Sequence, residues 1–203
     1  MYRPGMMISS VRIHFPASEA QAQSLLRLQV VFAEACNALA PLVREHRCWN
    51  RVALHHLAYR QMREAFPGLG SQMICNAIYS VSRAARLVYQ HPSSPWCIQG
   101  AAQRPLPLLR FSETAPVYFD RHTLSLRRGG VSMYTLDGRM LFEIELSPEL
   151  EARFRNEKIR EIILSRDVEG FFLCFTFADG EAAEASPVFP EYVVAISPEQ
   201  ASA

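Results

Sequence analysis

The sequence predicts an α+β fold, in which a small Greek-key (OB-like) β-barrel carries a helical insertion of about three helices after its first strand. A short alternating segment opens the chain, segments with helical periodicity follow up to residue 91, and apolar residues alternate with polar ones from residue 108. Strand edges must be covered or closed, which favours a barrel over an open sheet. We therefore expect a first barrel strand (1–16), a helical insertion (17–91), a connector (92–107), a β-barrel (108–180), and an acidic linker with a terminal strand (181–203).

The first strand is expected at Ile8–Phe15, where apolar side chains alternate until Pro16 ends the strand. Ser18 is suited to cap a helix, because an apolar stripe at three- and four-residue steps follows it and reaches Leu39. Pro41 is expected to disturb this helix, since proline has no backbone N–H to donate.

Two further helices complete the predicted insertion. Asn50 can cap a helix that continues to Phe66, and Ser71 can cap a third that continues to Gln90. The third helix should bury one stripe at helical spacing, formed by Ile74, Ile78, Val81, Ala85 and Val88.

The opposite side of the third helix combines hydrogen-bond donors with an aromatic ring and contains no acidic residue. Its members are Gln72, Asn76, Tyr79, Arg83, Arg86 and Gln90. This composition suits a phosphate backbone. An ordinary amphipathic helix with a solvated arginine face explains the same pattern, and it is the simpler interpretation of this helix considered alone.

The second half of the chain has the pattern of short strands joined by tight turns. Gly129-Gly130 and Asp137-Gly138 are strong hairpin signals, and another hairpin should turn between Asp167 and Gly170. The N-terminal strand would join the same barrel. The expected strands are 108–111, 117–120, 123–127, 131–136, 140–146, 159–166 and 170–177, with a last strand, YVVAI, at 192–196.

Charge is unevenly distributed, although the net charge is only +1. Residues 1–139 contain 16 Arg and 7 acidic residues, a net charge of +9, whereas residues 140–203 have a net charge of −8. No acidic residue lies between Glu64 and Glu113. This asymmetry indicates a polyanionic partner for the first part of the chain. Neutralisation of one part by the other across an internal interface is the alternative.

The composition is that of an ordinary soluble protein. No apolar run approaches the roughly 20 residues of a membrane span, and the N-terminus lacks the apolar core of a secretory signal. We therefore expect a cytoplasmic protein that does not contact a membrane. The five cysteines are scattered without a Cys-x-x-Cys pair, and they are expected to be buried or free thiols.

The sequence contains no Walker loop, no Gly-x-Ser-x-Gly elbow and no His-Glu-x-x-His motif. His55 and His56 point about 100° apart on a helix, which disfavours a shared metal ion. Glu143 and Glu145 have the spacing of paired carboxylates, but solvated positions on a barrel strand explain them better. Phe172 lies on the strand face opposite the core phenylalanines, where a base-stacking platform is a less favoured alternative. We expect no catalytic residues, no metal ligands and no cofactor.

Two stretches carry a resemblance to a known family. GLGSQMICNAIYSVSRAAR, at 68–86, resembles a helix in the recognition lobe of the TnpB transposon nucleases and the related type V CRISPR effectors. Phe119–Phe177 resembles the strand-rich wedge domain of that family, above all in the hairpin IREIILSRDVEGFFLCFTF. In the family, these two domains hold the scaffold of the guide RNA and the guide–target duplex. The resemblance spans nearly the whole chain and corresponds to the N-terminal half of the nucleases.

The chain departs from the family where the RuvC nuclease domain would begin. The family has a strand similar to v-v-G-I-D-x-G, which carries the first catalytic Asp. In VVAIS, Ala195 stands in place of the Gly and Ser197 in place of the Asp. A serine hydroxyl cannot replace a carboxylate as a charge-neutralising metal ligand. The resemblance thus implies that the protein does not cut through a RuvC site, and we expect that it is not an enzyme.

The leading hypothesis is a nuclease-less RNA-binding protein that holds a guide or structured RNA, with a DNA target and a separate protein subunit as further candidate partners. The alternative is a protein–protein adaptor or regulator that keeps the fold without binding nucleic acid. The residues expected to contact nucleic acid are Arg60, Arg63, Gln72, Asn76, Tyr79, Arg83, Arg86, Arg110, Arg127 and Arg128.

Overall fold

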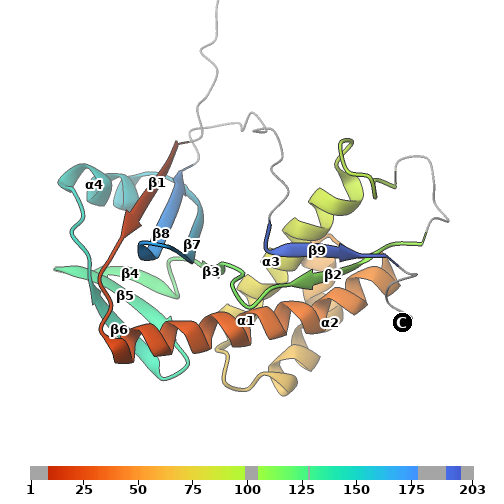
Figure 1. The fold of residues 1–203 in the computed structure, drawn as a ribbon, viewed down its shortest axis with the longest axis horizontal. Helices are drawn as coiled ribbons and strands as arrows, with labels where there is room; N and C mark the ends of the chain where they lie inside the picture. The colour runs from red at the N-terminus through yellow and green to blue at the C-terminus, as the bar shows by residue number, and fades with distance from the viewer. Residues whose placement is uncertain (1–8, 99–104, 128, 178–190, 198–203) are drawn as a thin grey trace, which may run out of the picture. The chain divides into compact units, whose positions relative to one another are not determined.

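A computed structural model describes residues 9–98, 105–127, 129–177 and 191–197 of the chain. The chain divides into two units (Figure 1), each described by itself below. The sheet unit comprises Met1–Leu28 and Pro116–Ser186, and the helix unit comprises Gln29–Ala115 and Pro187–Ala203. Helices and antiparallel sheets are both present, so the predicted α+β class is confirmed.

The sheet unit contains two antiparallel sheets, with strand orders β1-β8-β7-β3 and β4-β5-β6. As expected, the N-terminal strand joins the later strands, because β1 pairs with β8 in a register that places Ile13 opposite Leu173. The described strands do not close into a barrel, so the Greek-key (OB-like) barrel is not confirmed. The strands are β1 Ser9–His14, β3 Val117–Phe119, β4 Leu124–Arg127, β5 Gly130–Thr135, β6 Gly138–Glu143, β7 Ile159–Asp167 and β8 Gly170–Phe177.

Buried phenylalanines connect the two sheets. Phe15, just after β1, meets Phe142 of β6 edge-on, with 5.5 Å between the ring centroids, and stacks on Phe171 of β8 at 6.4 Å. Phe175 of β8 meets Phe154 edge-on at 5.8 Å. The odd-numbered phenylalanines of β8 therefore lie in the core, as the alternation of side chains along a strand predicts.

The helix α4, Pro148–Asn156, was not predicted. Ser147 caps it by accepting a hydrogen bond from the backbone N–H of Leu150, and a proline occupies the first helical position. Leu150 and Phe154, one turn apart, are its buried residues. The segment therefore has an ordinary helix start, although only strands were expected in this half of the chain.

The predicted hairpin turns are confirmed. β4 pairs with β5 around Gly129, and β5 pairs with β6 around Asp137-Gly138. Gly129, Gly138 and Gly170 have positive φ angles of 79°, 103° and 120°, a region that glycine adopts without steric cost.

The helix unit is built around α3, Ser71–Gln90. The predicted stripe from Ile74 to Val88 is buried as expected. Asn50 caps α2, Arg51–Ala65, as predicted, by accepting hydrogen bonds from Val52 and Ala53 N–H. Ser71 does not cap α3, because the helix already begins there and Gly70 is the N-cap.

The long helix α1, Glu19–His46, begins in the sheet unit and continues into the helix unit. Ser18 and Gln21 cap it reciprocally, each side chain bonding to the other residue's backbone N–H. Pro41 does not end the helix; Val43, beyond it, is still fully buried.

α1 is also the one described helix that is long and apolar enough to cross a membrane, with a mean hydropathy of 1.3 in its most apolar stretch. This property differs from the expectation that no apolar run approaches the length of a membrane span. It is weak support for a membrane span, because half of that stretch is buried inside the protein, as in an ordinary core helix.

A third sheet joins β2, Leu108–Phe111, to β9, Val193–Ile196, within the helix unit. This corrects the expectation that β2 belongs to the barrel. The Asn37 side chain from α1 donates to the Phe111 carbonyl at 3.0 Å and accepts from its N–H at 2.8 Å. β2 is therefore held by α1 on one side and by β9 on the other.

The five cysteines are free thiols, as expected. Cys36 of α1 is fully buried, and this burial raises the pKa of its thiol to about 12. Such a thiol stays protonated at neutral pH and packs as a small apolar side chain.

Candidate nucleic-acid interface

α3 leaves one narrow sector of its surface accessible. Arg86 and Gln90 are exposed in this sector, and Gln72, Cys75, Tyr79 and Arg83 are half-buried. Five of these six residues belong to the predicted face, and no acidic residue occurs anywhere on the helix. The sector therefore keeps the combination of guanidinium groups, amides and an aromatic ring that the sequence indicated.

Asn76 was wrongly placed on this face. Its side chain is only 5% exposed, and its amide nitrogen lies 3.9 Å from the Met73 sulfur. α3 is covered over more than half of its circumference, so its accessible sector is narrower than that of a surface helix. Cys75 occupies the place that was assigned to Asn76.

α2 adds a second row of side chains, at every fourth position from Arg51 through His55 and Tyr59 to Arg63. The Arg51 guanidinium lies 5.2 Å from the centre of the Tyr79 ring, a cation–π contact that joins the two helices. Arg63 donates a hydrogen bond to the Leu69 carbonyl in the loop before α3. We call the set Arg51, His55, Tyr59, Arg63, Gln72, Tyr79, Arg83 and Arg86 the α2–α3 surface.

Sequence reasoning missed Arg51, His55 and Tyr59. The signal was present, because their spacing of four residues places them along one side of the helix. Arg60 was predicted instead, but it follows Tyr59 in sequence and therefore lies about 100° away around the helix. Arg60 is 94% exposed and bonds to Glu64 at 3.2 Å, so its charge is already compensated locally.

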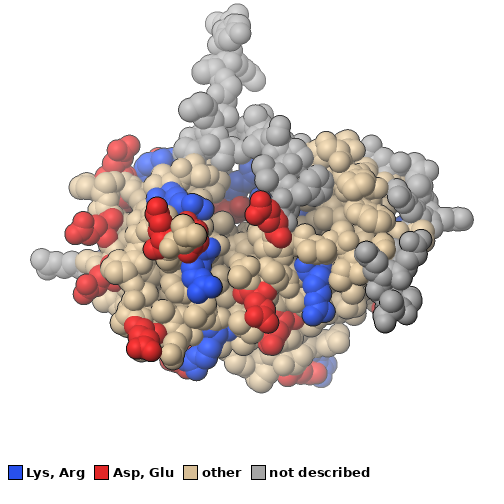
Figure 2. All heavy atoms as spheres, in the orientation of Figure 1, with Lys and Arg blue, Asp and Glu red and all other residues tan. Residues whose placement is uncertain are grey.

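The remaining predicted arginines are not on α2 or α3. Arg110 is exposed on β2 of the helix unit, and Arg127 is exposed at the end of β4 in the sheet unit. Arg128 lies outside the described residues. On the face of the sheet unit seen in Figure 2, basic and acidic side chains are interspersed, so this face does not present a patch of one sign.

A hollow in the helix unit is a further cationic feature. It has a volume of about 420 Å³ and is lined by Pro41, Arg44, Glu45, Arg47, Pro105 and Leu106. Arg47 has a φ of 48°, the left-handed conformation that more often belongs to glycine or asparagine at a helix end. The hollow is open, and Glu45 offsets part of its positive charge.

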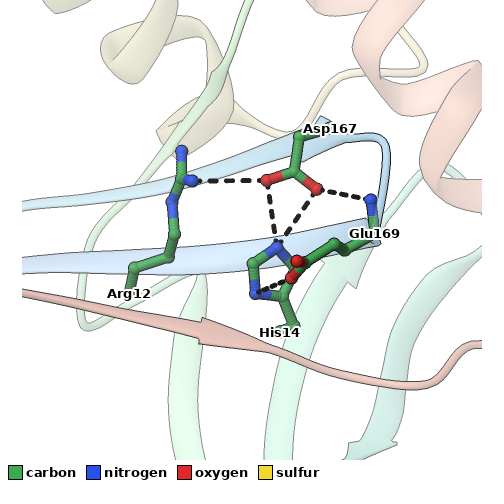
Figure 3. Close-up of polar contacts among 4 residues, drawn as sticks. All are labelled: Arg12, His14, Asp167 and Glu169. Atoms are coloured by element: carbon green, nitrogen blue, oxygen red, sulfur yellow. Dashed lines mark hydrogen bonds and ion pairs between the residues drawn. The ribbon is translucent and has the colours of Figure 1, made fainter.

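The sheet unit contains a polar cluster that the sequence did not reveal (Figure 3). The His14 Nε2 atom lies 3.1 and 3.0 Å from the two Asp167 carboxylate oxygens, and its Nδ1 atom lies 3.6 Å from Glu169. Arg12 donates to Asp167 at 3.3 Å. These contacts tie the edge strand β1 to the turn between β7 and β8.

The same cluster bears on the proposed stacking platform at Phe172. The Arg12 guanidinium lies 3.7 Å from the centre of the Phe172 ring, and the ring is only 5% exposed. A base cannot stack on a ring that is covered in this way. The suggestion that Phe172 binds a base is therefore wrong for this conformation.

The cluster shifts the titration of Asp167. Burial acts to raise the pKa of this carboxyl, but hydrogen bonds from His14 and from the Glu169 N–H, together with the charges of His14 and Arg12, outweigh it. The pKa of Asp167 is therefore below its ordinary value. Among the described residues, no three His, Cys, Asp or Glu side chains are arranged to hold a metal ion.

We predict that Asp167→Asn lowers the melting temperature at neutral pH and that the difference from the native protein disappears in acid. Since folding lowers this pKa, the carboxylate stabilises the fold above the ordinary aspartate value of about 4, and its contribution is lost as the pH falls through the lower folded value. Melting curves from pH 7 down to about pH 2 measure this. Glu145→Gln, at an exposed carboxylate, is the control. If the difference in melting temperature between Asp167→Asn and the native protein persisted unchanged in acid, the ionised Asp167 carboxylate would not be the stabilising group.

No protein-family model matches the chain, and a search of curated proteins finds no match either.

Proposed function

We propose that this protein binds RNA through the α2–α3 surface and acts as a binding protein, not as a nuclease. The observation that carries the proposal is the accessible sector of α3, which presents Arg83 and Arg86 beside Tyr79 without any acidic residue on the helix. Guanidinium groups bind phosphate oxygens in a bidentate manner, and α3 itself contributes no carboxylate that would repel a phosphate. Arg51 extends this chemistry onto α2.

The resemblance to the front half of the TnpB and type V effectors supports the same proposal. In this interpretation, the helix unit corresponds to part of the recognition lobe. The two sheets that meet at Phe15 and Phe142 correspond to an OB-like wedge barrel. Ser197 directly follows β9, where the family has its first metal-binding Asp. The proposed ligand is a guide or structured RNA in the cytoplasm, with the DNA target and a nuclease-bearing subunit as candidate partners.

The first test is whether RNA remains bound to the purified protein and how its affinity responds to salt. Three or four arginine–phosphate contacts predict a slope of log affinity against log salt of about −2 to −3, from roughly −0.7 per phosphate on a single strand. Fluorescence anisotropy with a labelled RNA, repeated over a range of salt concentrations, gives this slope. Protein that carries no nucleic acid and binds no RNA even at low salt would refute the proposal.

A protein–protein adaptor is the second candidate. Val52 and Leu57 on α2 are 64% and 41% exposed, and Val194 on β9 is 58% exposed. Apolar side chains in such positions are frequent in contact surfaces, although isolated ones are also common on monomers. A pull-down after nuclease treatment separates the candidates, because an adaptor retains its partner when RNA has been digested and an RNA-dependent assembly does not.

A further inference from the structure

Two aromatic rings lie in the α2 row, which consists of Arg51, His55, Tyr59 and Arg63. Phosphate binding does not explain how these two rings are arranged. The rings of His55 and Tyr59 lie with their centroids 4.6 Å apart and an angle of 19° between their planes. The two residues are one helical turn apart, and both side chains are half-buried. They therefore form a preformed stack in which part of the aromatic surface remains accessible.

The core of the helix pair does not require these rings. Leu54, Ala58 and Met62 supply the buried stripe of α2, and their side chains are 0%, 0% and 2% exposed. His55 and Tyr59 lie beside this stripe, at its edge. An aliphatic side chain would cover the same edge, so the parallel rings are more informative about a ligand than about the packing of α2.

The charges around the stack favour an anionic ligand. Arg51 lies one turn before His55 and reaches Tyr79 on α3, and Arg83 lies one turn after Tyr79. No Asp or Glu occurs in the row Arg51–His55–Tyr59–Arg63 or on α3. An aromatic surface bordered by guanidinium groups is suited to a nucleotide, whose base stacks while its phosphates meet the arginines.

We infer that Tyr59, backed by His55, stacks against an unpaired base, so that the α2–α3 surface prefers a single-stranded segment of nucleic acid to a duplex. This inference rests on the proposed function and specifies the form of its ligand. The bases of a duplex are stacked on one another and offer their faces only at the ends. A duplex can therefore engage the arginines but not the ring of Tyr59.

Fluorescence anisotropy with three labelled probes of about twelve nucleotides or base pairs tests this: an oligouridylate, an oligothymidylate and a blunt RNA duplex. Tyr59→Leu should weaken binding of the oligouridylate about tenfold and leave the duplex unchanged, because a stacked base typically contributes that much. Tyr59→Phe keeps the ring and should bind like the native protein. His56→Leu, on the neighbouring and exposed histidine, is the matched control. Thermal melting of each variant verifies that α2 remains folded.

The outcomes separate the inference from the proposal on which it rests. If Tyr59→Leu weakens the single strands and the duplex equally, or weakens neither, the stacking site is refuted while RNA binding stands. If the native protein binds none of the probes, the proposed function itself fails. An equal loss with oligouridylate and oligothymidylate supports a site that recognises the unpaired base; a loss with oligouridylate alone supports the same site with selectivity for RNA.

Discussion

Replacing both Arg83 and Arg86 with glutamate is expected to weaken RNA binding on the order of 100-fold near physiological salt. The two residues are three positions apart, so their guanidinium groups lie on the same side of α3 and can contact neighbouring phosphates. Reversing the two charges removes two attractive contacts with phosphates and adds two repulsive ones. The affinity for RNA should therefore also depend less steeply on salt. Arg86 is exposed and Arg83 is half-buried, so the buried stripe that holds α3 in place is unchanged.

The matched control is the double reversal of Arg155 and Arg160, which changes the net charge by the same amount on the sheet unit, where both residues are exposed. If the control weakens binding as strongly as the α3 variant, the effect is one of overall charge. Arg60→Glu should have little effect, because Arg60 is already compensated by Glu64 and stands outside the α2–α3 surface. Native affinity in the Arg83/Arg86 variant would remove the α3 face from the site.

The parts of the fold that sequence predicted correctly are those determined by neighbours a few residues apart. The apolar stripe of α3 follows from the period of 3.6 residues, and the caps at Ser18 and Asn50 follow from side chains that reach backbone N–H groups within three residues. The turn at Asp137-Gly138 follows from the need for a positive φ.

Features that depend on distant parts of the chain were not predictable in this way. β2 and β9 are separated by more than eighty residues, and nothing in either strand specifies the other as its partner. The contact between His14 and Asp167 was not predictable for the same reason, since it requires β1 to lie beside the β7–β8 hairpin. Local patterns identify strands, but pairing is decided by how the whole chain packs.

The candidate site contains features that local sequence determines and features that depend on distant parts of the chain. Tyr79, Arg83 and Arg86 lie in the accessible sector of α3, as expected, because this sector is opposite the buried stripe. Asn76 was not, because the width of the buried sector depends on how many elements surround α3. The α2 row was missed for a different reason: its periodicity was visible, but its relation to α3 depends on a tertiary contact between Arg51 and Tyr79.

The largest expected effect on stability comes from Gly130, at the start of the central strand β5 of the three-stranded sheet. A Cβ atom added there would lie 2.1 Å from the backbone oxygen of Phe142 on β6 and 3.0 Å from its carbonyl carbon. The obstacle is backbone, so no side-chain rotation relieves it. Phe142 is fully buried against Phe15, and a shift of β6 would therefore disturb the contact between the two sheets.

We predict that Gly130→Ala lowers the free energy of unfolding by about 3 kcal/mol. This value is at the upper end of the range for overpacking substitutions, because β5 and β6 must move apart to accommodate the new methyl group. Urea unfolding followed by circular dichroism measures the change. Gly68→Ala is the matched control: a Cβ there meets no atom within 4 Å, and Gly68 is not among the glycines with positive φ. The control should change stability by less than about 1 kcal/mol, with a small gain expected because alanine restricts the unfolded chain. Equal effects of the two substitutions would show that β5 and β6 do not approach each other as closely as this structure places them.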